Sequence, residues 1–568
     1  MDKQIFIDFI KDFLSVQSKA DSFSHNICNI IDELSKATSE DLQESLSSIF
    51  EDTADCLSPI VPDGFTNASQ KVNSCFCVNP CNNNCLNNIF FIDTSRYIAD
   101  DFENITPYSG FDSSNPENAR QNTFAWSFAD LNDFIYVGTG RNIIYQWLMS
   151  TLKYLQIPLE YTPSQINMSA EIWRYKKDGS LPWQKVYEAP VNVETNEPDI
   201  IGINSLIKFD SFGIQPALYA SAYSLNGIKI LKSFNGIDWF EIPTEIDGGI
   251  YSNNMIVYDN KIYLAVTPDN ENLPSLLYSS KDPEIFGWTL ETPQGEEGKN
   301  PIGTIWSMIP FNDHFYVGTS SENGFMIWRT NSNTPKVNEW TLVVDKGAGD
   351  ASNYAPISLV EFKNSLYIGT TYNTSSFMSY ILPKGAEIIR LDRDDNWRII
   401  VGGPVVIETN PETGYRNHPL SGFANGFFNP YNLSMWQMKV YNDKLFIGTY
   451  DNSYSVESTY KLLLKNRESL SQIIDETLID IVILFVKLQL TILSEIPNRL
   501  GFDFYVTDDG INFKVIDKKG FNNPENFGIS NIFISDDNNL YIGTANPISG
   551  CQVYKLITDS NNKNNTQI

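Results

Sequence analysis

Four cysteines stand close together near the start of the chain, in the pattern Cys75-x-Cys77-x3-Cys81-x3-Cys85. Four thiolates at short spacing are the ligand set of zinc sites and of iron–sulfur clusters. The spacing matches neither the Cys-x2-Cys pairs of zinc ribbons nor the usual ferredoxin runs, and the neighbouring asparagines are typical of turns. A metal site, disulfides or intermolecular cross-links, and reduced loop thiols all fit the segment. The spacing favours the reduced thiols.

Histidine and carboxylate chemistry has few candidates. The three histidines are His25, His314 and His418, and only His418 lies in a long loop. A Ser–His–Asp site would have to use it, but no Gly-x-Ser-x-Gly elbow accompanies it. The acidic turns at 508–510 and 536–537 carry the oxygen ligands that Ca²⁺ prefers, without the twelve-residue loop of a calcium site. The sequence therefore predicts no cofactor, with Zn²⁺ or Ca²⁺ as the alternatives.

Side chains suited to recognition gather in the long connection 402–432. Loops of this length inside a compact domain are usually functional, although a well-packed covering loop is the plainer interpretation. Arg141, at the start of an insertion, and Trp306, in a predicted strand, extend the set. The candidate ligand-binding residues are Arg141, Trp306, Tyr415, Arg416, His418 and Tyr431.

Composition limits the classes of partner. The formal net charge is -29 over 568 residues, which argues against nucleic-acid binding and disfavours anionic membrane surfaces. The same charge suits cations, basic partners or neutral ligands. With 42% hydrophobic and 13% aromatic residues, the chain can bury a large core.

A short apolar motif, most often ending in Gly-Thr, recurs seven times and predicts the elements that position these residues. The copies are FIYVGT (134–139), LYASAY (218–223), IYLAVT (262–267), FYVGTS (315–320), LYIGTT (366–371), LFIGTY (445–450) and LYIGTA (540–545). Each belongs to a unit with period-2 alternation that reads as four antiparallel strands. The pattern predicts an all-β fold, a seven-bladed β-propeller over 88–557. Unit seven lacks its last strand, and residues 88–94 are predicted to supply it and close the ring.

Two turns carry a more specific pattern, SFNGIDWF (233–240) and TDDGINFK (507–514). They resemble the Asp-box repeat, Ser/Thr-x-Asp-x-Gly-x-x-Trp/Phe, of sialidase-like propellers (BNR-type repeats). The resemblance implies structural turns in which the Asp or Asn side chain binds backbone N–H groups and Gly takes a positive φ. The turn residues are Ser233, Asn235, Gly236 and Trp239 in one copy and Thr507, Asp509, Gly510 and Phe513 in the other. Arginines are scarce and no Arg-Ile-Pro motif is present, so the resemblance implies architecture and transfers no catalytic residues.

The remaining segments lie outside the repeat. Residues 1–56 have helical apolar spacing, 57–87 form a linker rich in Cys, Asn and Pro, and 558–568 form a polar tail. Insertions at 141–168 and 453–500 read as apolar helices that leave the same face of the propeller. They are predicted to form a helical cap on that face, either as plain packing or as a lid or docking platform.

Targeting signals are missing from the sequence pattern. The first sixteen residues include Asp and Lys and lack a continuous apolar run, so they do not read as a secretory signal. The apolar stretch 478–493 is interrupted by Asp480, Lys487 and Gln489 and falls short of a membrane span. A cytoplasmic location is predicted, or a surface coat if the cysteine segment is cross-linked.

Three functions are consistent with these observations. The favoured one is a non-catalytic propeller that binds a protein or glycan partner through its capped funnel face. The second is a glycan-active hydrolase or lyase whose site uses Arg141, Arg416, His418 and nearby carboxylates. The third is a coat-type protein that self-associates through the apolar helices and the cysteine segment.

Overall fold

The computed structural model describes most of the chain from residue 97 onward. The described residues are 97–143, 167–192, 198–213, 215–224, 227–246, 249–268, 274–292, 298–372, 383–403, 416, 418–465, 467–471, 476–495 and 500–557. The predicted N-terminal helices, the cysteine segment, residues 88–94, the polar tail and most of the first insertion lie outside these ranges.

The strands of the described residues are antiparallel and pair in sequence order, four to a unit. Unit 1 contains β2 (Asn122–Leu131), β3 (Phe134–Arg141), β4 (Glu171–Lys176) and β5 (Gln184–Glu188); unit 2 contains β6 (Ile200–Asp210), β7 (Pro216–Ser224), β8 (Lys229–Ser233) and β9 (Phe240–Ile242). Unit 3 contains β10 (Gly249–Tyr258), β11 (Lys261–Pro268), β12 (Leu276–Ser280) and β13 (Thr289–Leu290); unit 4 contains β14 (Ile305–Phe311), β15 (His314–Thr319), β16 (Met326–Thr330) and β17 (Trp340–Val344). Unit 5 contains β18 (Asn353–Phe362), β19 (Ser365–Tyr372), β20 (Ile388–Leu391) and β21 (Trp397–Val401); unit 6 contains β22 (Asn432–Tyr441), β23 (Lys444–Asp451), β24 (Phe504–Thr507) and β25 (Phe513–Asp517). Unit 7 contains β26 (Gly528–Ile534), β27 (Leu540–Ala545), β28 (Val553–Leu556) and β1 (Phe102–Asn104). The predicted all-β, antiparallel class is confirmed, and each copy of the repeated motif lies mainly in the second strand of its unit.

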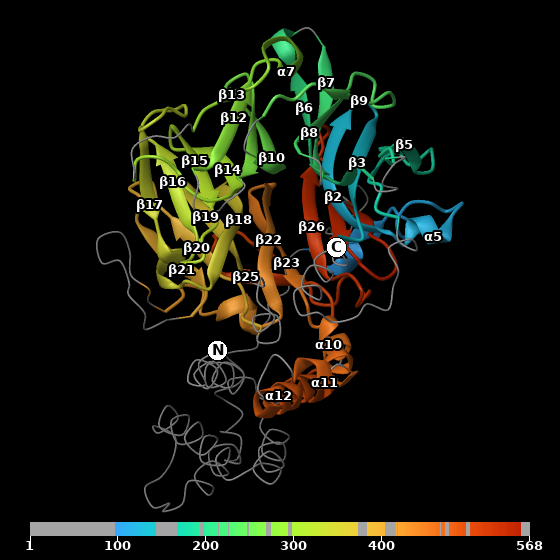
Figure 1. The fold of residues 1–568 in the computed structure, drawn as a ribbon, viewed down its shortest axis with the longest axis vertical. Helices are drawn as coiled ribbons and strands as arrows, with labels where there is room; N and C mark the ends of the chain where they lie inside the picture. The colour runs from blue at the N-terminus through green and yellow to red at the C-terminus, as the bar shows by residue number, and fades with distance from the viewer. Residues whose placement is uncertain are drawn as a thin grey trace, which may run out of the picture.

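The first strands of the units contact one another in a closed series. Each first strand contacts that of the next unit, from β2 through β6, β10, β14, β18 and β22 to β26, and β26 contacts β2. Figure 1 shows the sheets ranged about a common centre, with β10, β18, β22 and β26 toward the middle. A closed series of sheets protects the first strands from pairing with other chains.

Serine side chains reinforce several of these contacts. Ser127 Oγ donates to the Ile203 carbonyl at 2.6 Å, Ser307 Oγ to Pro356 at 2.6 Å, Ser358 Oγ to Met435 at 2.9 Å and Ser530 Oγ to Ala125 at 2.7 Å. The last of these bonds joins unit 7 to unit 1. All four serines are buried, so each hydroxyl needs the partner that the neighbouring unit supplies.

The glycine of the repeated motif is explained by the same close approach. A Cβ at Gly369 would lie 2.5 Å from Ser358 Oγ and 2.7 Å from the Met435 carbonyl oxygen, and Gly138 meets Ser127 and Ile203 in the same way. Both neighbours are in strands held by their own pairing, so they cannot move aside cheaply. Glycine therefore leaves room for the next unit in units 1 and 5, whereas Ser221 and Ala265 stand at the equivalent positions of units 2 and 3.

Replacing Gly369 with alanine is expected to lower the free energy of unfolding by about 1 to 3 kcal/mol, the usual cost of overpacking a core. Urea titration followed by tryptophan fluorescence measures the change. Ser365→Ala, in the same strand, should shift stability by less than about 0.5 kcal/mol. Equal effects of the two substitutions would contradict the packing argument.

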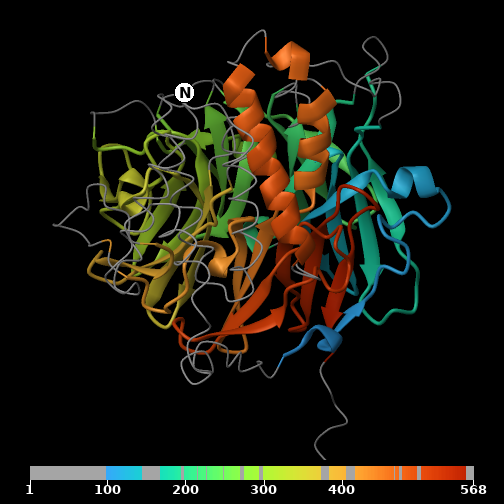
Figure 2. The ribbon, with the colours of Figure 1, turned by 90° about the horizontal axis from the view of Figure 1, so that it is seen from below.

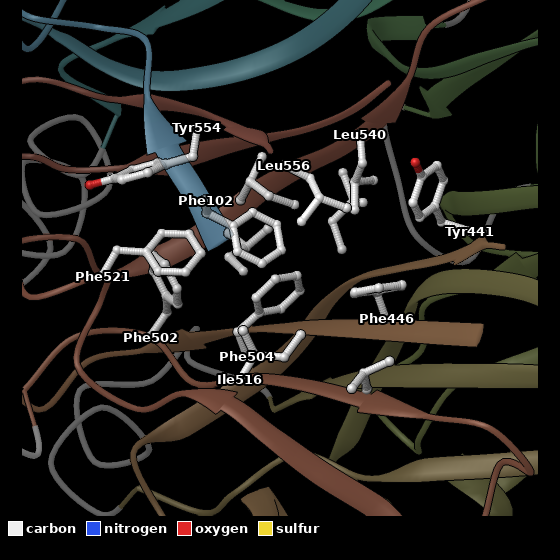
Figure 3. Close-up of a cluster of buried hydrophobic side chains, with 14 residues drawn as sticks. Phe102, Tyr441, Phe446, Phe502, Phe504, Ile516, Phe521, Leu540, Tyr554 and Leu556 are labelled. Atoms are coloured by element: carbon white, nitrogen blue, oxygen red, sulfur yellow. The ribbon is translucent and has the colours of Figure 1, made fainter. Parts of the chain in front are cut away.

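The strand that completes unit 7 differs from the prediction. It is β1, whose Phe102, Glu103 and Asn104 pair with Leu556, Lys555 and Tyr554 of β28. The prediction placed residues 88–94 there, and this was wrong. Phe102 is buried in an aromatic and aliphatic cluster between β28 and unit 6, with the Phe504 and Phe521 ring centroids 5.6 and 5.3 Å away (Figure 3). This packing selects 102–104 as the closing strand.

The helices of the second insertion all lie on one side of the sheets. They are α10 (Ser455–Lys465), α11 (Arg467–Leu470) and α12 (Glu476–Glu495), and Figures 1 and 2 show them below the sheets and across their end. The helices predicted within 453–500 are thus present. We call this end, where α10 follows β23, the helix face, and the opposite end, which carries the turns between third and fourth strands, the turn face.

Short helices occupy the connections. They are α5 (Pro116–Ala119), α7 (Pro283–Phe286) and α8 (Lys346–Gly349), with 3-10 turns η2 (Ala99–Asp101), η4 (Ser211–Gly213) and η5 (Asn425–Phe428). No helix in the described part of the chain has the length and apolar character needed to cross a membrane.

The two predicted turns have the geometry expected from their residues. Asn235 Oδ1 accepts from the Ile237 and Asp238 amides at 2.9 Å, and Asp509 Oδ1 accepts from the Ile511 and Asn512 amides at 2.9 and 2.8 Å. Ser233 and Thr507 hydroxyls accept from the Gly236 and Gly510 amides, and both glycines have positive φ. A Cβ on either glycine would also strike the tyrosine hydroxyl of the preceding unit, Tyr136 or Tyr367. Trp239 and Phe513 pack against the core beside these turns.

Candidate functional site

A buried polar cluster recurs in units 1, 5, 6 and 7, at the helix face. In each, an asparagine at the start of the first strand donates from Nδ2 to the side chain at the start of the third strand and to a glycine carbonyl. The pairs are Asn122–Glu171 (2.8 Å), Asn353–Glu387 (2.7 Å), Asn432–Asp503 (2.8 Å) and Asn526–Gln552 (2.9 Å). The glycine carbonyls belong to Gly110, Gly347, Gly426 and Gly520. We call each cluster a polar junction.

The Thr of the repeated motif belongs to the same junctions. Thr139 Oγ1 donates to the Glu171 carbonyl at 3.1 Å, and Thr370 and Thr449 hold Glu387 and Asp503 in the same way. Sequence reasoning missed the junctions. The signal was present in GFFNPYN (426–432) and GFNNPEN (520–526), where a glycine precedes the asparagine by six residues. These glycines have φ of 62° and 58°, a conformation that favours glycine.

Arg141 and Arg416 supply the positive charge of two junctions. Arg141 is fully buried, with Nη1 3.7 Å from Glu171 Oε2 and further bonds to Asn118 and Asn122. Arg416 is also buried, ion-paired with Glu387 and 3.5 Å from Asp350. Both guanidinium groups are therefore enclosed by protein. Contact of either arginine with a ligand stays a prediction.

These charges act on the carboxylates that they contact. Burial alone would raise the pKa of Glu171, but the Arg141 charge and bonds from Asn118 and Asn122 hold it below its usual value. Burial opposes ionisation of Asp350 as well, and Lys384 and Arg416 outweigh it, so its pKa is also lowered. Carboxylates held ionised in this way are structural anions rather than proton donors.

The junction of unit 6 has a different charge balance. Within the described ranges, neither Asp503 nor the adjacent Asp451 forms an ion pair with lysine or arginine. Burial and the Asp503 charge raise the pKa of Asp451 to about 7. Asp451 Oδ1 accepts from the Ser453 amide at 2.8 Å and Oδ2 from Asn429 Nδ2 at 2.7 Å, just before α10 begins. The carboxyl of Asp451 therefore anchors the start of the helical insertion.

A continuous series of aromatic rings crosses the centre of the helix face. Adjacent ring centroids are 4.6 Å apart for Tyr251–Tyr223, 6.0 Å for Tyr223–Trp126, 5.6 Å for Trp126–Phe124, 5.5 Å for Phe124–Trp436 and 5.4 Å for Trp436–Tyr450. We call these six residues the aromatic arc. Its members come from first and second strands of units 1, 2, 3 and 6, which only the closed arrangement of units brings together.

Local backbone features position the arc. Trp126 and Trp436 lie where the pairing of β2 with β3 and of β22 with β23 shifts register. Gly202 and Gly528 leave the room that the two indoles fill, since a Cβ there would lie within 2.7 Å of the rings. All members except the buried Phe124 are half-buried, and burial raises the pKa of Tyr223 to about 12.

Amide side chains line the first strands beside the arc. Asn204 Nδ2 donates to the Ser252 carbonyl, Asn254 Nδ2 to the Trp306 carbonyl at 3.4 Å and Asn531 Nδ2 to the Trp126 carbonyl at 3.0 Å. The three asparagines are half-buried. Rings and neutral amides together suit a ligand that offers both apolar faces and hydroxyl groups.

The other predicted residues are placed as follows. Trp306 is half-buried next to Asn254, and its buried Nε1 has no hydrogen-bond partner. Tyr431 is buried, with its hydroxyl 3.2 Å from Gln489 Oε1 on α12. His418 is exposed, and Tyr415 lies outside the described residues. The structure thus places Trp306 beside Asn254 and makes Tyr431 a contact between unit 6 and the insertion.

Metal ligation has no support within the described ranges. There, no group of three or more His, Cys, Asp or Glu side chains is placed to share a metal ion. Asp508 and Asp536, from the acidic turns, form ion pairs with Lys444 and Lys208. The four clustered cysteines lie outside these ranges, so the zinc alternative stays a prediction.

Replacing Tyr431 with phenylalanine is expected to destabilise the docking of α12 by about 1 kcal/mol, because the bond to Gln489 is lost. Hydrogen exchange of α12 amides should quicken while exchange in the β-strands stays unchanged. Tyr460→Phe, on α10, is the matched control. Uniform quickening across the whole chain would contradict a local role.

No protein-family model matches the sequence, and no curated protein matches it. A structure described as streptogramin B lyase has a TM-score of 0.38 and 11% identity, covering 78% of this chain and 95% of that one. A protein of unknown function from Dyadobacter fermentans has a TM-score of 0.32 and 13% identity, covering 62% and 95%. YjhT has a TM-score of 0.32 and 12% identity, covering 61% and 93%. Scores this low carry no argument, so functional inference rests on the contacts within the chain.

Proposed function

We propose that the chain is a seven-bladed β-propeller of the Asp-box type that works as a binding module. The closed series of contacts from β2 to β26 and back supports this architecture, as do the two Asn- and Asp-closed turns. In this proposal units 1 to 7 are the blades, and α10–α12 form part of a cap over the helix face. The cytoplasmic location stays a prediction.

The ligand of this module is a neutral glycan bound on the aromatic arc. The observation that carries the proposal is the arc itself, with five half-buried rings and three neutral amides beside it. Sugar rings present apolar C–H faces that stack on aromatic rings, and their hydroxyl groups pair with amides. The rings are also held by packing, so little conformational entropy is lost on binding.

A binding role is favoured over catalysis by the state of Glu171 and Glu387, two carboxylates of the polar junctions. Glu171 and Glu387 are buried and engaged by arginine, asparagine and lysine side chains, so they already have structural partners. A general acid needs a proton at working pH and a free path to the substrate. The proposed module therefore releases its glycan unchanged.

The test is calorimetric titration of the full chain with neutral hexasaccharides of glucose, xylose, mannose and galactose. The proposal expects binding of at least one, with no new reducing ends after overnight incubation. Product release would favour the hydrolase alternative. Absence of binding across the panel would overturn the glycan assignment and leave the protein-partner form of the module.

Two substitutions localise any binding. Trp436→Leu and Tyr251→Leu keep apolar volume but remove the ring faces at either side of the arc, and each should weaken binding about tenfold, which is within the range of lost aromatic contacts. Trp288→Leu, half-buried at the turn face, is the matched control. If all three variants bind as the parent does, the arc is not the site.

A further inference from the structure

The turn face carries exposed apolar side chains on unit 2. Phe234, Ile237 and Phe240 lie in or beside the turn between β8 and β9 and are 45%, 48% and 40% exposed. The rings of Phe234 and Phe240 lie 6.2 Å apart, and Lys232 Nζ sits 4.5 Å from the centre of the Phe234 ring. The two rings therefore form one surface, with Ile237 between them in the chain.

Unit 3 continues this surface. Its turn holds the short helix α7, which Asp282 caps through bonds to the Glu284 and Ile285 amides at 3.0 and 3.2 Å. Ile285 and Phe286, at the end of this helix, are 68% and 62% exposed. These two are the most exposed large apolar side chains in the described part of the chain.

An ion pair joins the two turns. Lys232 of unit 2 pairs with Glu284 of unit 3, which places Ile285 and Phe286 beside the unit 2 turn. Figure 1 shows α7 at the end of the molecule opposite α10–α12. We call Phe234, Ile237, Phe240, Ile285 and Phe286 the turn-face patch. It lies on the opposite end from the aromatic arc, so it is a separate surface.

The fold does not require apolar residues here. The unit 6 turn has the same hydrogen bonds as the unit 2 turn, yet Asp508 stands where unit 2 has Phe234, and Asp508 pairs with Lys444. The same backbone thus tolerates a charged residue at that position. Contiguous exposed apolar side chains that the fold does not need mark interaction surfaces.

The charge of the whole chain selects the occupant. Asp238, Glu241 and Glu284 adjoin patch residues in the chain, Lys229 and Lys232 pair with Glu241 and Glu284, and Lys281 precedes α7. A second copy would bring its own charge of -29 and be repelled, and an anionic membrane would be repelled as well. We propose that the turn-face patch binds a short cationic amphipathic segment of another protein.

The test uses a fluorescein-labelled eighteen-residue amphipathic peptide of leucine and lysine, with a scrambled peptide of equal charge. Anisotropy of the peptide is measured against the full chain at low and high salt. The proposal expects binding that weakens with salt and falls at least tenfold in Ile285→Ser/Phe286→Ser. Equal binding of the scrambled peptide would overturn it, because charge alone would then account for the affinity.

Matched controls distinguish binding at this surface from nonspecific binding to exposed apolar side chains. Leu181→Ser/Val337→Ser removes apolar side chains of 39% and 40% exposure from the turns of units 1 and 4 and should bind as the parent does. Asp238→Lys keeps the apolar side chains but should also weaken binding. Self-association of the parent that the patch variant abolishes would assign the surface to a second copy and overturn the proposal.

Discussion

Arg141→Met is expected to lower the free energy of unfolding by about 3 to 5 kcal/mol, the usual cost of removing one partner of a buried ion pair. The guanidinium and the Glu171 carboxylate are both fully buried, so the substitution leaves Glu171 charged and partly uncompensated. Lys185, 3.0 Å from Glu171, compensates only from the surface side. Arg416→Met should lower the free energy of unfolding in the same way, because it leaves the Glu387 carboxylate uncompensated. Urea titration measures both changes.

The control is Arg120→Ala, which breaks an exposed pair with Glu117 and should change stability by less than about 0.5 kcal/mol. Adding Glu171→Gln to Arg141→Met should recover part of the loss, because the unpaired charge is then removed. If Arg141→Met is instead as stable as Arg120→Ala and yet binds glycan more weakly, that result would support the sequence-based prediction that Arg141 contacts a ligand.

Stability is expected to fall as pH rises from 5 to 8, by about 2 to 3 kcal/mol from Asp451 alone. The pKa of Asp451 is raised in the folded state from 3.8 to about 7, so the folded protein binds the proton more tightly than the unfolded chain does. The stabilising contribution is therefore full at low pH and is lost as pH rises through 7. Asp517, whose pKa is also raised, acts in the same direction.

Carboxylates with lowered pKa values, such as Glu171, act in another range. Their contribution to stability is lost only as pH falls below the pKa of carboxylates in the unfolded chain, which is about 4. They therefore do not affect the change in stability above pH 5. Urea titrations at pH 5, 6, 7 and 8 measure the slope, and Asp451→Asn should flatten it. Asp480→Asn, at an exposed pair with Arg467, should leave the slope unchanged. An unchanged slope in Asp451→Asn would contradict the assignment.

The repeat made the strands predictable because period-2 alternation and Gly-Thr endings are local patterns. Residues such as Gly236 and Asp509 were assigned to closed turns correctly, since the turn bonds form within a few residues. The closing strand was misplaced because a strand of three residues, 102–104, is too short to show period-2 alternation. Its pairing with β28 and the packing of Phe102 against Phe504 and Phe521 identify it.

The candidate site was harder to predict than the fold. The sequence predicts Arg141 and Arg416 as ligand-binding residues, but it does not show their burial among Asn118, Asn122 and Glu387, which depends on contacts between separate segments of the chain. The aromatic arc was not predicted at all, since its six rings come from four units.

By itself, the sequence determined the strand order, the antiparallel units and the turns between them, because these depend on contacts between neighbours in the chain. The tertiary structure alone decided three features. These are the strand that completes unit 7, the burial of Arg141 and Arg416 in the interior, and the contacts between aromatic side chains of units 1, 2, 3 and 6. These depend on ring closure, which brings together residues as distant as Ala125 and Ser530. A local sequence pattern does not predict a contact between residues so far apart in the chain.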